Sequence, residues 1–513
     1  MCQISPIIRA FLANTERSPE KDALRINEYV ISYNDLKIKA GKLSGYFKKL
    51  GIKKEDRVAV LLPNSIEFAL VMLAAADLGL TCVPQNQTLP TNTLFRSFLA
   101  ADVKHLIAHH SLLPDIKKLA GSFFSNDSAI ISVGKELNSF SYFDDYTQIE
   151  HVLGKNEVSP DTPYILSLTS GSTGEPKPII LSQECKIKRA LAAKDLYKVK
   201  SCDIIMAATP LYHSLAERLV LMPLLLGATA VILPGFTPTL WLRAIENHKV
   251  TFTIAVSSQI KSIFEEISKQ NYCLDSLRCL VSSSARLDSD IKLKLLNFLS
   301  CDFHECYGTS EIAIASNLTK KDGFIKTDSV GKPAPGTEIL IINEKNEILP
   351  ALKKGEICCK TPMVFSGYYK QPETTKKSFF GKYFKTGDAG YIDSDGYLYY
   401  SGRIKDIIIT GGINVYPKDI EDVILTHPAV EECVALALPD TKLVEIIAVA
   451  LKIKEGSILT GRELQRLSAK HLADYQQPMK YICVSRIPKN SIGKTDKNEL
   501  LRLITEECYG EPL

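Results

Sequence analysis

The chain has 513 residues, which exceeds the usual size of one domain and predicts two to four folded units. Hydrophobic residues make up 45% and charged residues 23% of it, the composition of an ordinary globular protein. Because 62 basic side chains nearly balance 58 acidic ones, for a formal charge of +4, the composition gives no indication of a nucleic-acid or anionic-membrane partner.

The 13 cysteines are scattered and contain no C-x-x-C spacing. An odd number without a framework predicts reduced thiols and a cytoplasmic setting. The histidines do not fall at zinc-ligand spacings with these cysteines. Residues 1–16 lack a signal-peptide pattern, and the longest apolar run, 219–234, is too short to cross a bilayer. We therefore expect a cytoplasmic protein without a transmembrane segment.

Helical and strand patterns alternate at the start of the chain. Apolar residues repeat at helical spacing over 35–50 and 67–78, and buried strands are indicated at 57–62, 81–84 and 104–108. Strand and helix in alternation at this spacing predict a mostly parallel α/β sheet.

The pattern changes along the rest of the chain. Residues 125–162 are polar and loosely patterned, and the α/β alternation resumes over 202–282. After residue 329, short alternating runs split by Gly and Asp predict a small β subdomain, and a compact α+β unit follows residue 403.

We therefore expect an α/β fold with a large N-terminal domain over residues 1–402 and a small C-terminal domain over 407–513. The boundary at 403–406 is short and charged, without a Pro/Gly/Ser tract, and is predicted to act as a hinge.

A hydroxyl-rich stretch at 169–177 lies between two apolar runs that fit buried strands, and it reads Thr-Ser-Gly-Ser-Thr-Gly-Glu-Pro-Lys. Gly171 and Gly174 allow positive φ and bring amide N–H groups close to anionic oxygen, while Lys177 adds a cation. It is not a Walker loop, because a proline stands on each side of the lysine. The stretch predicts a polyphosphate-binding hairpin, with a polar surface turn as the alternative.

Five further stretches carry reactive residue types, and they follow the hairpin in order. They are Pro-Leu-Tyr-His-Ser at 210–214, Tyr-Gly-Thr-Ser-Glu at 307–311, Tyr-Phe-Lys-Thr-Gly-Asp at 383–388 with Gly-Arg-Ile-Lys-Asp at 402–406 behind it, Gly-Gly-Ile-Asn-Val-Tyr-Pro at 411–417, and Gly-Lys at 493–494. With these motifs in this order, nearly the whole chain resembles the adenylate-forming superfamily of acyl-CoA synthetases, amino-acid adenylation domains and luciferases. One such motif is weak, whereas six in the order of the family are highly specific.

The resemblance implies ATP, Mg²⁺ and coenzyme A as reactants and cofactors, and an AMP-binding domain followed by a mobile lid domain. Glu311 fits as the Mg²⁺ ligand, because Mg²⁺ takes few carboxylates and relies on phosphates and water for the rest. Asp388 suits the ribose hydroxyls. The ATP or AMP contacts that the resemblance implies are Thr169, Ser170, Gly171, Ser172, Thr173, Gly174, Lys177, Ser283, Ser284, Tyr307, Gly308, Ser310, Asp388 and Arg403.

Catalysis is expected from four residues, namely Lys494, Thr309, Glu311 and His213. Lys494 would be delivered by the small domain to bridge the carboxylate and the α-phosphate, while Thr309 or Ser310 would bond the α-phosphate. Lys405 occupies the hinge position of the family. Gly411 and Gly412 would leave room for the pantetheine arm of CoA in a thiol channel.

Several segments are expected to form the acid pocket, and Arg286 is a further candidate to face it. The expected set is His213, Ser214, Ser258, Ser283, Ser284, Tyr307 and 312–314. Ser214 stands where amino-acid adenylation domains place an Asp, so a free α-amino acid is disfavoured. Three departures from the family pattern leave the efficiency of the enzyme and its subgroup open: Pro178, Gln183 and Val444.

The leading hypothesis is a ligase that joins a fatty or aryl carboxylic acid to CoA in two ATP-driven steps, acting as a monomer or homodimer. A stand-alone acyl-AMP ligase that loads a separate acyl carrier protein is the alternative within the superfamily. A catalytically silent nucleotide-binding or interaction protein is the alternative from another class.

Overall fold

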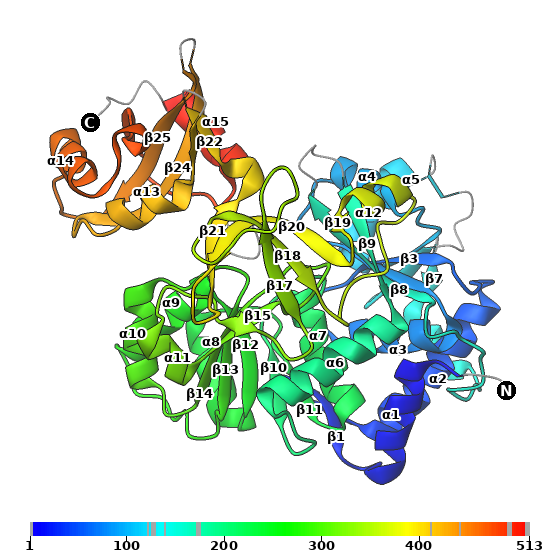
Figure 1. The fold of residues 1–513 in the computed structure, drawn as a ribbon. Helices are drawn as coiled ribbons and strands as arrows, with labels where there is room; N and C mark the ends of the chain where they lie inside the picture. The colour runs from blue at the N-terminus through cyan, green and yellow to red at the C-terminus, as the bar shows by residue number, and fades with distance from the viewer. Residues whose placement is uncertain are drawn as a thin grey trace.

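The computed structural model describes residues 4–120, 123–124, 130–137, 140–170, 176–410, 413–440, 443–489 and 495–507. The described strands form four sheets, and two of them are large α/β sheets that make up the body of the molecule (Figure 1). A small β-sheet crosses above these two, and the last sheet belongs to the C-terminal part at the upper left of the view (Figure 1).

The seven-stranded sheet is parallel except for its last pair. In sheet order, its strands are β7 (Ser141–Tyr142), β6 (Ile130–Val133), β5 (His105–His109), β3 (Arg57–Leu61), β4 (Thr81–Pro84), β8 (Pro163–Ser170) and β9 (Pro176–Ser182). The helical segments of this region are α1 (Pro6–Arg17), α2 (Tyr33–Lys49), α3 (Ile66–Leu78), α4 (Thr91–Ala100), η1 (His110–Leu112), α5 (Leu113–Ala120) and η3 (Phe143–Gln148).

The nine-stranded sheet has a parallel centre and antiparallel edges. In sheet order, its strands are β16 (Lys332–Pro333), β15 (Ser316–Thr319), β14 (Asp302–Tyr307), β13 (Cys279–Ser283), β12 (Phe252–Val256), β10 (Ile204–Ala207), β11 (Thr229–Ile232), β1 (Asp22–Ile26) and β2 (Tyr29–Ser32). Its helices are α6 (Gln183–Tyr197), α7 (Ser214–Leu226), α8 (Pro238–His248), α9 (Ser257–Ile267), α10 (Ser289–Phe298) and α11 (Lys320–Ile325).

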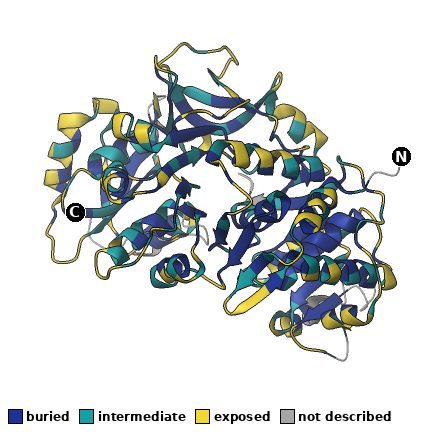
Figure 2. Cartoon of the chain, turned by 90° about the horizontal axis from the view of Figure 1, so that it is seen from below, coloured by how far each residue is buried: buried dark blue, intermediate teal, exposed yellow. Residues whose placement is uncertain are grey.

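One hydrophobic core lies between the two large sheets, because successive side chains of a strand point to opposite faces. On β10, Ile205 and Ala207 belong to this central core, whereas Met206 belongs to an outer core with α8 and α9. On β3, Val58 and Val60 face the centre and the alternate residues face an outer core with α4. The helices α1, α2, α3, α6 and α7 contribute buried residues to the central core, whereas α4 packs on one outer core and α8, α9 and α10 on the other; Figure 2 shows which parts of the chain are buried.

The other two sheets come from the last third of the chain. The small β-sheet contains β17 (Glu338–Ile342), β18 (Gly355–Lys360), β19 (Phe379–Phe380), β20 (Tyr383–Ile392) and β21 (Leu398–Arg403), with α12 (Pro372–Lys377) beside it. After η4 (Ile404–Asp406), the C-terminal part contains β22 (Ile408–Thr410), β23 (Ile413–Val415), α13 (Pro417–Ile424), β24 (Val430–Asp440), β25 (Val444–Ile453), α14 (Gly461–His471), η5 (Asp474–Gln476), β26 (Lys480–Cys483) and α15 (Lys497–Glu507).

The expected fold class is confirmed, including the mostly parallel sheets, the small β unit and the α+β unit at the end. The interpretation of 125–162 as loosely patterned was incomplete, because β6 extends the seven-stranded sheet there and all its residues are buried. None of the described helices is long and apolar enough to cross a membrane. Within the described part of the chain, eleven cysteines are free.

A buried ion pair fixes the end of β14. Lys292 of α10 and Glu305 of β14 are 0% and 1% exposed, and their Nζ and Oε2 atoms lie 2.5 Å apart. Glu305 also accepts a hydrogen bond from the amide of Leu287 at 2.8 Å. Burial raises the pKa of the Glu305 carboxyl, and Lys292 acts against that rise. The pair thus ties the segment after β13 to β14, next to the expected nucleotide residues.

We predict that Lys292→Met lowers the free energy of unfolding by about 3–5 kcal/mol at neutral pH, because it leaves a buried carboxylate without its cation. The loss should grow between pH 5 and pH 8. The folded-state pKa of Glu305 is then raised further, so protonation favours the folded state at low pH and this contribution disappears as the pH rises. Urea unfolding at both pH values measures this effect, and an equal loss at both would contradict it.

Candidate active site

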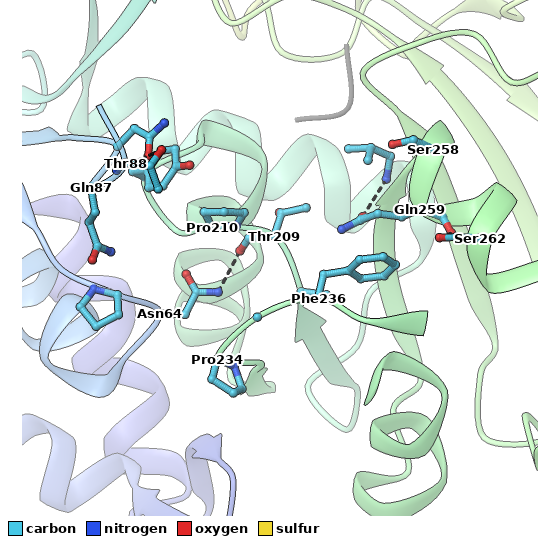
Figure 3. Close-up of a pocket in the computed structure, with 16 residues that line it drawn as sticks. Asn64, Gln87, Thr88, Thr209, Pro210, Pro234, Phe236, Ser258, Gln259 and Ser262 are labelled. Atoms are coloured by element: carbon cyan, nitrogen blue, oxygen red, sulfur yellow. Dashed lines mark hydrogen bonds between the residues drawn. The ribbon is translucent and has the colours of Figure 1, made fainter. Parts of the chain in front are cut away.

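A cavity of about 550 Å³ opens where parallel strands of both large sheets end. It is lined by segments that follow β3, β4, β10, β11 and β12, the edge at which ligands of open α/β sheets bind (Figure 3). None of the described residues that line it carries a charged side chain; they are Pro63, Asn64, Asn86, Gln87, Thr88, Ala208, Thr209, Pro210, Tyr212, Pro234, Gly235, Phe236, Val256, Ser258, Gln259 and Ser262.

Asn64 joins the two sheets at the wall of this cavity. Its Nδ2 donates to the carbonyl oxygens of Thr209 at 3.0 Å and Leu233 at 2.8 Å, and its Oδ1 accepts from the amide of Leu211 at 2.8 Å (Figure 3). One side chain after β3 therefore fixes the segments that follow β10 and β11. The 210–214 motif begins on this support.

The hydroxyl-rich hairpin is flanked by the two strands that the sequence predicted. β8 and β9 pair antiparallel up to Ser170 and Pro176, and Lys177 is partly exposed. The tip with Gly171, Ser172, Thr173 and Gly174 lies outside the described residues, as do the side chains of Thr169 and Ser170.

The outer edge of β9 is covered by residues 366–369. The amide of Ile180 donates to the oxygen of Gly367, and the amide of Tyr369 donates to the oxygen of Pro178, both at 2.9 Å. Pro178 thus keeps its carbonyl paired, and proline is tolerated at such a sheet edge. This contact brings a segment almost two hundred residues away, after β18, against the expected phosphate hairpin.

Tyr368 connects Lys177 with Glu311. The Nζ of Lys177 lies 5.9 Å from the centre of the Tyr368 ring, and the Tyr368 hydroxyl donates to Glu311 Oε1 at 3.0 Å. Burial and the nearby Glu311 charge raise the pKa of Tyr368, so the hydroxyl stays protonated and donates. A cation from the phosphate hairpin and the expected Mg²⁺ ligand therefore meet at one ring.

The backbone that carries Glu311 is fixed by a buried arginine. Arg189 of α6 is 1% exposed, and its Nη2 donates to the carbonyl oxygens of Ser310 and Glu311, both at 2.9 Å. Its Nε donates to the oxygen of Met363 at 3.1 Å, and the amide of Phe365 bonds Glu311 O at 2.7 Å. Because α6 directly follows β9, one helix couples the hairpin to the Glu311 loop.

Tyr307, Asp388 and Arg403 form a second group. The Tyr307 hydroxyl donates to Asp388 Oδ2 at 2.7 Å, and Arg403 Nε lies 2.9 Å from Asp388 Oδ1. Asp388 is 2% exposed. Burial lowers the pKa of Arg403, but Asp388 and nearby tyrosines outweigh it and raise that pKa. The ring of Tyr307 lies 5.8 Å from that of Tyr400, so one of its sides is already covered by protein.

Backbone geometry constrains two residues near Tyr307. A Cβ on Gly308 would lie 1.8 Å from the oxygen of Ala313, so this position requires glycine. Ser284 adopts a φ of 75°, a region that favours glycine, at the point where the sequence replaces a Gly/Ala-rich segment. Its neighbour Ser283 accepts a weak bond from the Cys306 thiol at 3.3 Å, across β13 and β14.

The remaining expected acid-pocket residues separate into two groups. His213 precedes α7, with its ring 4.3 Å from that of Tyr212, and Ser258 lines the cavity. Ile312 and Ile314, in contrast, are 0% and 1% exposed within the central core.

Arg286 does not face the acid pocket that the sequence suggested. Its Nη2 lies 3.3 Å from Asp422 and 3.6 Å from Asp328, because α13 of the C-terminal part packs beside it. Lys354 and Asp419 form a second ion pair to the same helix at 2.7 Å.

Other expected residues lie on or near the C-terminal part. Lys405 is exposed in η4, the short connection between β21 and β22. Gly411, Gly412 and Lys494 fall outside the described residues. Gln183 is 0% exposed, accepts from Ser5 Oγ and donates to the oxygen of Ala76 at 2.9 Å, so its place in the structure is the core.

The residues present fit ATP better than an isolated metal ion. Among described residues, no group of three or more His, Cys, Asp or Glu side chains could bind a metal. A single carboxylate, Glu311, fits Mg²⁺ only where phosphate oxygens and water complete the coordination. Tyr368 links Glu311 to Lys177, the lysine of the expected phosphate hairpin.

Sequence reasoning missed three residues of this site: Asn64, Arg189 and Tyr368. Their partners are main-chain oxygens or side chains far away in sequence, which no local pattern marks. Of the three, only Arg189 could have been identified from the sequence, because a charged residue on the inward face of a helix requires a partner inside the protein.

The fold and the site define an adenylate-forming type of α/β enzyme, and comparison with known proteins gives the family. A family model described as AMP-binding enzyme matches residues 11–369, and one described as AMP-binding enzyme C-terminal domain matches residues 419–494. The first match alone covers more than half of the chain, so the chain belongs to the family of AMP-binding enzymes.

The relatives carry the names of CoA ligases. The long-chain-fatty-acid–CoA ligase of Bacillus subtilis is 28% identical over 96% of this chain and 93% of its own length. The oxalate–CoA ligase of Arabidopsis thaliana is 31% identical over 90% of each chain. The structure of the o-succinylbenzoate CoA synthetase of Bacillus subtilis with its acyl-adenylate intermediate has a TM-score of 0.85 and 25% identity, covering 97% of this chain and 98% of that one. This chain is accordingly an acid–thiol ligase, which forms carbon–sulfur bonds.

We predict that Arg189→Met lowers the free energy of unfolding by about 2–4 kcal/mol, because it removes three hydrogen bonds from a buried guanidinium to main-chain oxygens, of which the oxygen of Glu311 keeps the amide of Phe365. Lys188→Met on the same helix is the matched control. Its side chain is 47% exposed with one surface pair, so we expect a change of about 0.5 kcal/mol or less. Urea unfolding compares the two, and equal stability of both variants would contradict the assigned role.

Proposed function

We propose that this enzyme converts a carboxylic acid, ATP and CoA into an acyl-CoA thioester, AMP and pyrophosphate. The observation that supports this most is the meeting of Lys177 and Glu311 at Tyr368, since both come from motifs expected to bind the phosphates and Mg²⁺. The names of the relatives support CoA as the acceptor.

In the first half-reaction, a carboxylate oxygen of the acid attacks the α-phosphorus of ATP, the bond to the bridging oxygen breaks, and pyrophosphate leaves. The hairpin at 169–177 neutralises the departing phosphates, and Thr309 or Ser310 donates to the α-phosphate. Glu311 would hold Mg²⁺, which would supply further charge neutralisation there. Asp388 and Arg403 bind the ribose, and the segment of Ser283, Ser284 and Tyr307 lies along the adenine.

In the second half-reaction, the thiol sulfur loses its proton and attacks the acyl carbon, and AMP leaves with the bonding electron pair. The cavity at the sheet edge takes the neutral parts of the substrates, because its lining is polar and apolar without charge. We propose that residues 407–513 act as a lid that turns about 403–406, with Lys405 in the hinge. The lid then exchanges Lys494 for Gly411 and Gly412 at the site.

The test is acid-dependent exchange of pyrophosphate into ATP across short, fatty and aryl acids, followed by addition of CoA. We expect exchange with at least one class of acid and thioester formation on adding CoA. Thioester formation only with an acyl carrier protein would move the assignment to a carrier-loading ligase. Absence of exchange with every acid would favour a silent nucleotide-binding protein.

We predict that Lys494→Ala slows adenylation by about 10²- to 10³-fold, because one preorganised cation at the developing charge is lost. Thioester formation from supplied acyl-adenylate should survive. Lys489→Ala is the control, because that lysine is 37% exposed and paired with Glu432 on the surface. Equal losses in both half-reactions would show that Lys494 does not act in adenylation alone.

A further inference from the structure

Residues 365–368 hold Glu311 at two points. The amide of Phe365 donates to the main-chain oxygen of Glu311 at 2.7 Å, and the Tyr368 hydroxyl donates to its Oε1 at 3.0 Å. Both donors belong to the segment that covers β9, where the amide of Ile180 donates to the oxygen of Gly367 at 2.9 Å. The main chain and the carboxylate of the expected Mg²⁺ ligand are therefore both fixed by the segment that lies against the phosphate hairpin.

The Tyr368 residue is itself held in place. Its side chain is buried, and its ring lies 4.8 Å from the ring of Phe365 at an interplanar angle of 65°, an edge-on contact that aromatic pairs prefer. The amide of Tyr368 donates to Thr375 Oγ1 of α12 at 2.9 Å. Gly367 adopts a φ of 124°, which other residues rarely adopt, so the backbone before Tyr368 favours glycine. The main chain and the ring of Tyr368 are thus both fixed where the hydroxyl meets Glu311.

The contact with Tyr368 leaves one oxygen of Glu311 for a ligand. Glu311 is partly exposed, and within the described part of the chain only its Oε1 has a side-chain hydrogen bond, so Oε2 remains. A single carboxylate oxygen suits Mg²⁺, which keeps phosphate oxygens and water as its other ligands. Groups that hydrogen-bond a metal-ligating carboxylate orient it and raise the affinity for the metal. Tyr368 has the position of such an orienting partner.

We propose that Tyr368 is a positioning residue of the metal site, whose hydroxyl occupies Oε1 of Glu311 and so keeps Oε2 for the Mg²⁺ that accompanies ATP. This inference rests on the nucleotide binding of the proposed function. Tyr368 acts through Glu311, and its ring also lies 5.9 Å from Lys177 Nζ, which keeps the lysine of the hairpin near the same carboxylate.

The experiment measures how tightly the full-length protein with α,β-methylene-ATP binds Mn²⁺, a paramagnetic substitute for Mg²⁺, by electron paramagnetic resonance. The methylene group replaces the oxygen at which ATP is cleaved, so the complex does not react, and the Mn²⁺–analogue complex without protein is the blank. Tyr368→Phe keeps the ring and removes the hydroxyl. We expect it to weaken Mn²⁺ binding by about 10- to 100-fold, the usual effect of losing the partner of a metal ligand. Binding of the analogue without metal should not change.

Tyr369→Phe is the matched control. It removes a hydroxyl from the next residue of the same segment, and that hydroxyl donates to Asp102 Oδ2 at 3.0 Å instead of to Glu311. Mn²⁺ binding should remain as in the wild-type protein. In a Glu311→Gln background, Tyr368→Phe should have no further effect on Mn²⁺ binding, because the two residues act as one unit.

A second readout separates metal affinity from a defect of the fold. Excess Mg²⁺ should restore pyrophosphate exchange in Tyr368→Phe, whereas it would not repair a misfolded site. Circular dichroism checks that each variant is folded. If Tyr368→Phe does not fold, Thr375→Ala takes its place, because it releases the amide of Tyr368 and should weaken Mn²⁺ binding in the same direction by a smaller factor.

Wild-type Mn²⁺ affinity in Tyr368→Phe would overturn the inference. Equal losses in Tyr368→Phe and Tyr369→Phe would overturn it as well, because the effect would then belong to the segment as a whole. A loss of analogue binding that is equal with and without metal would assign Tyr368 to the nucleotide or to the fold.

Failure of the proposed function gives a different result. A wild-type protein that binds Mn²⁺ with the analogue but shows no exchange with any acid would contradict the ligase function and leave the role of Tyr368 standing. A wild-type protein that binds no Mn²⁺ with the analogue would overturn both.

Discussion

The site depends on the buried guanidinium of Arg189 and its bonds to main-chain oxygen. It joins the helix that follows the phosphate hairpin to the loop of Ser310 and Glu311 and to the segment of Met363. These three parts come from separate segments of the chain, and the Arg189 side chain helps to fix their relative positions. Its hydrogen bonds are buried, so the loss of one of them costs more free energy than the loss of an exposed bond. The proposed binding of phosphate and Mg²⁺ would require that accuracy, because a catalytic group displaced by about 1 Å loses much of its effect.

Charged side chains are unevenly distributed around Arg189. The described residues that line the cavity at the sheet edge are uncharged, whereas Lys186 and Arg189 of α6 and Glu217 and Arg218 of α7 are charged. The proposed chemistry uses both environments, since anionic phosphates and carboxylates meet cations while the uncharged arm of the thiol passes through the neutral cavity. Exclusion of water from the same space protects an acyl-adenylate from hydrolysis.

Ion pairs are among the contacts between the C-terminal part and the body, together with the packing of α13 against β21. Arg286 with Asp422 and Lys354 with Asp419 join it to α13, and such partly exposed pairs contribute little stability each. The proposed turn of the C-terminal part about η4 would have to break these contacts. Of the departures, Pro178 lies at a sheet edge with its carbonyl paired, and the side-chain oxygen and nitrogen of Gln183 each have a hydrogen-bond partner in the core.

The sequence by itself determined the order of strands and helices, the two strands that flank the hairpin at 169–177, and the reactive motifs. The reason is that periodicity and turn residues are local properties of the chain. Only the tertiary structure decided which of these meet: Tyr368 between Lys177 and Glu311, Tyr307 on Asp388, and Arg286 on the C-terminal helix instead of in the acid pocket. It also showed that β6 lies within the stretch taken as loosely patterned. The physical reason is that buried polar and charged groups take partners that are close in space and far apart in sequence, and one sequence without its fold does not contain those distances.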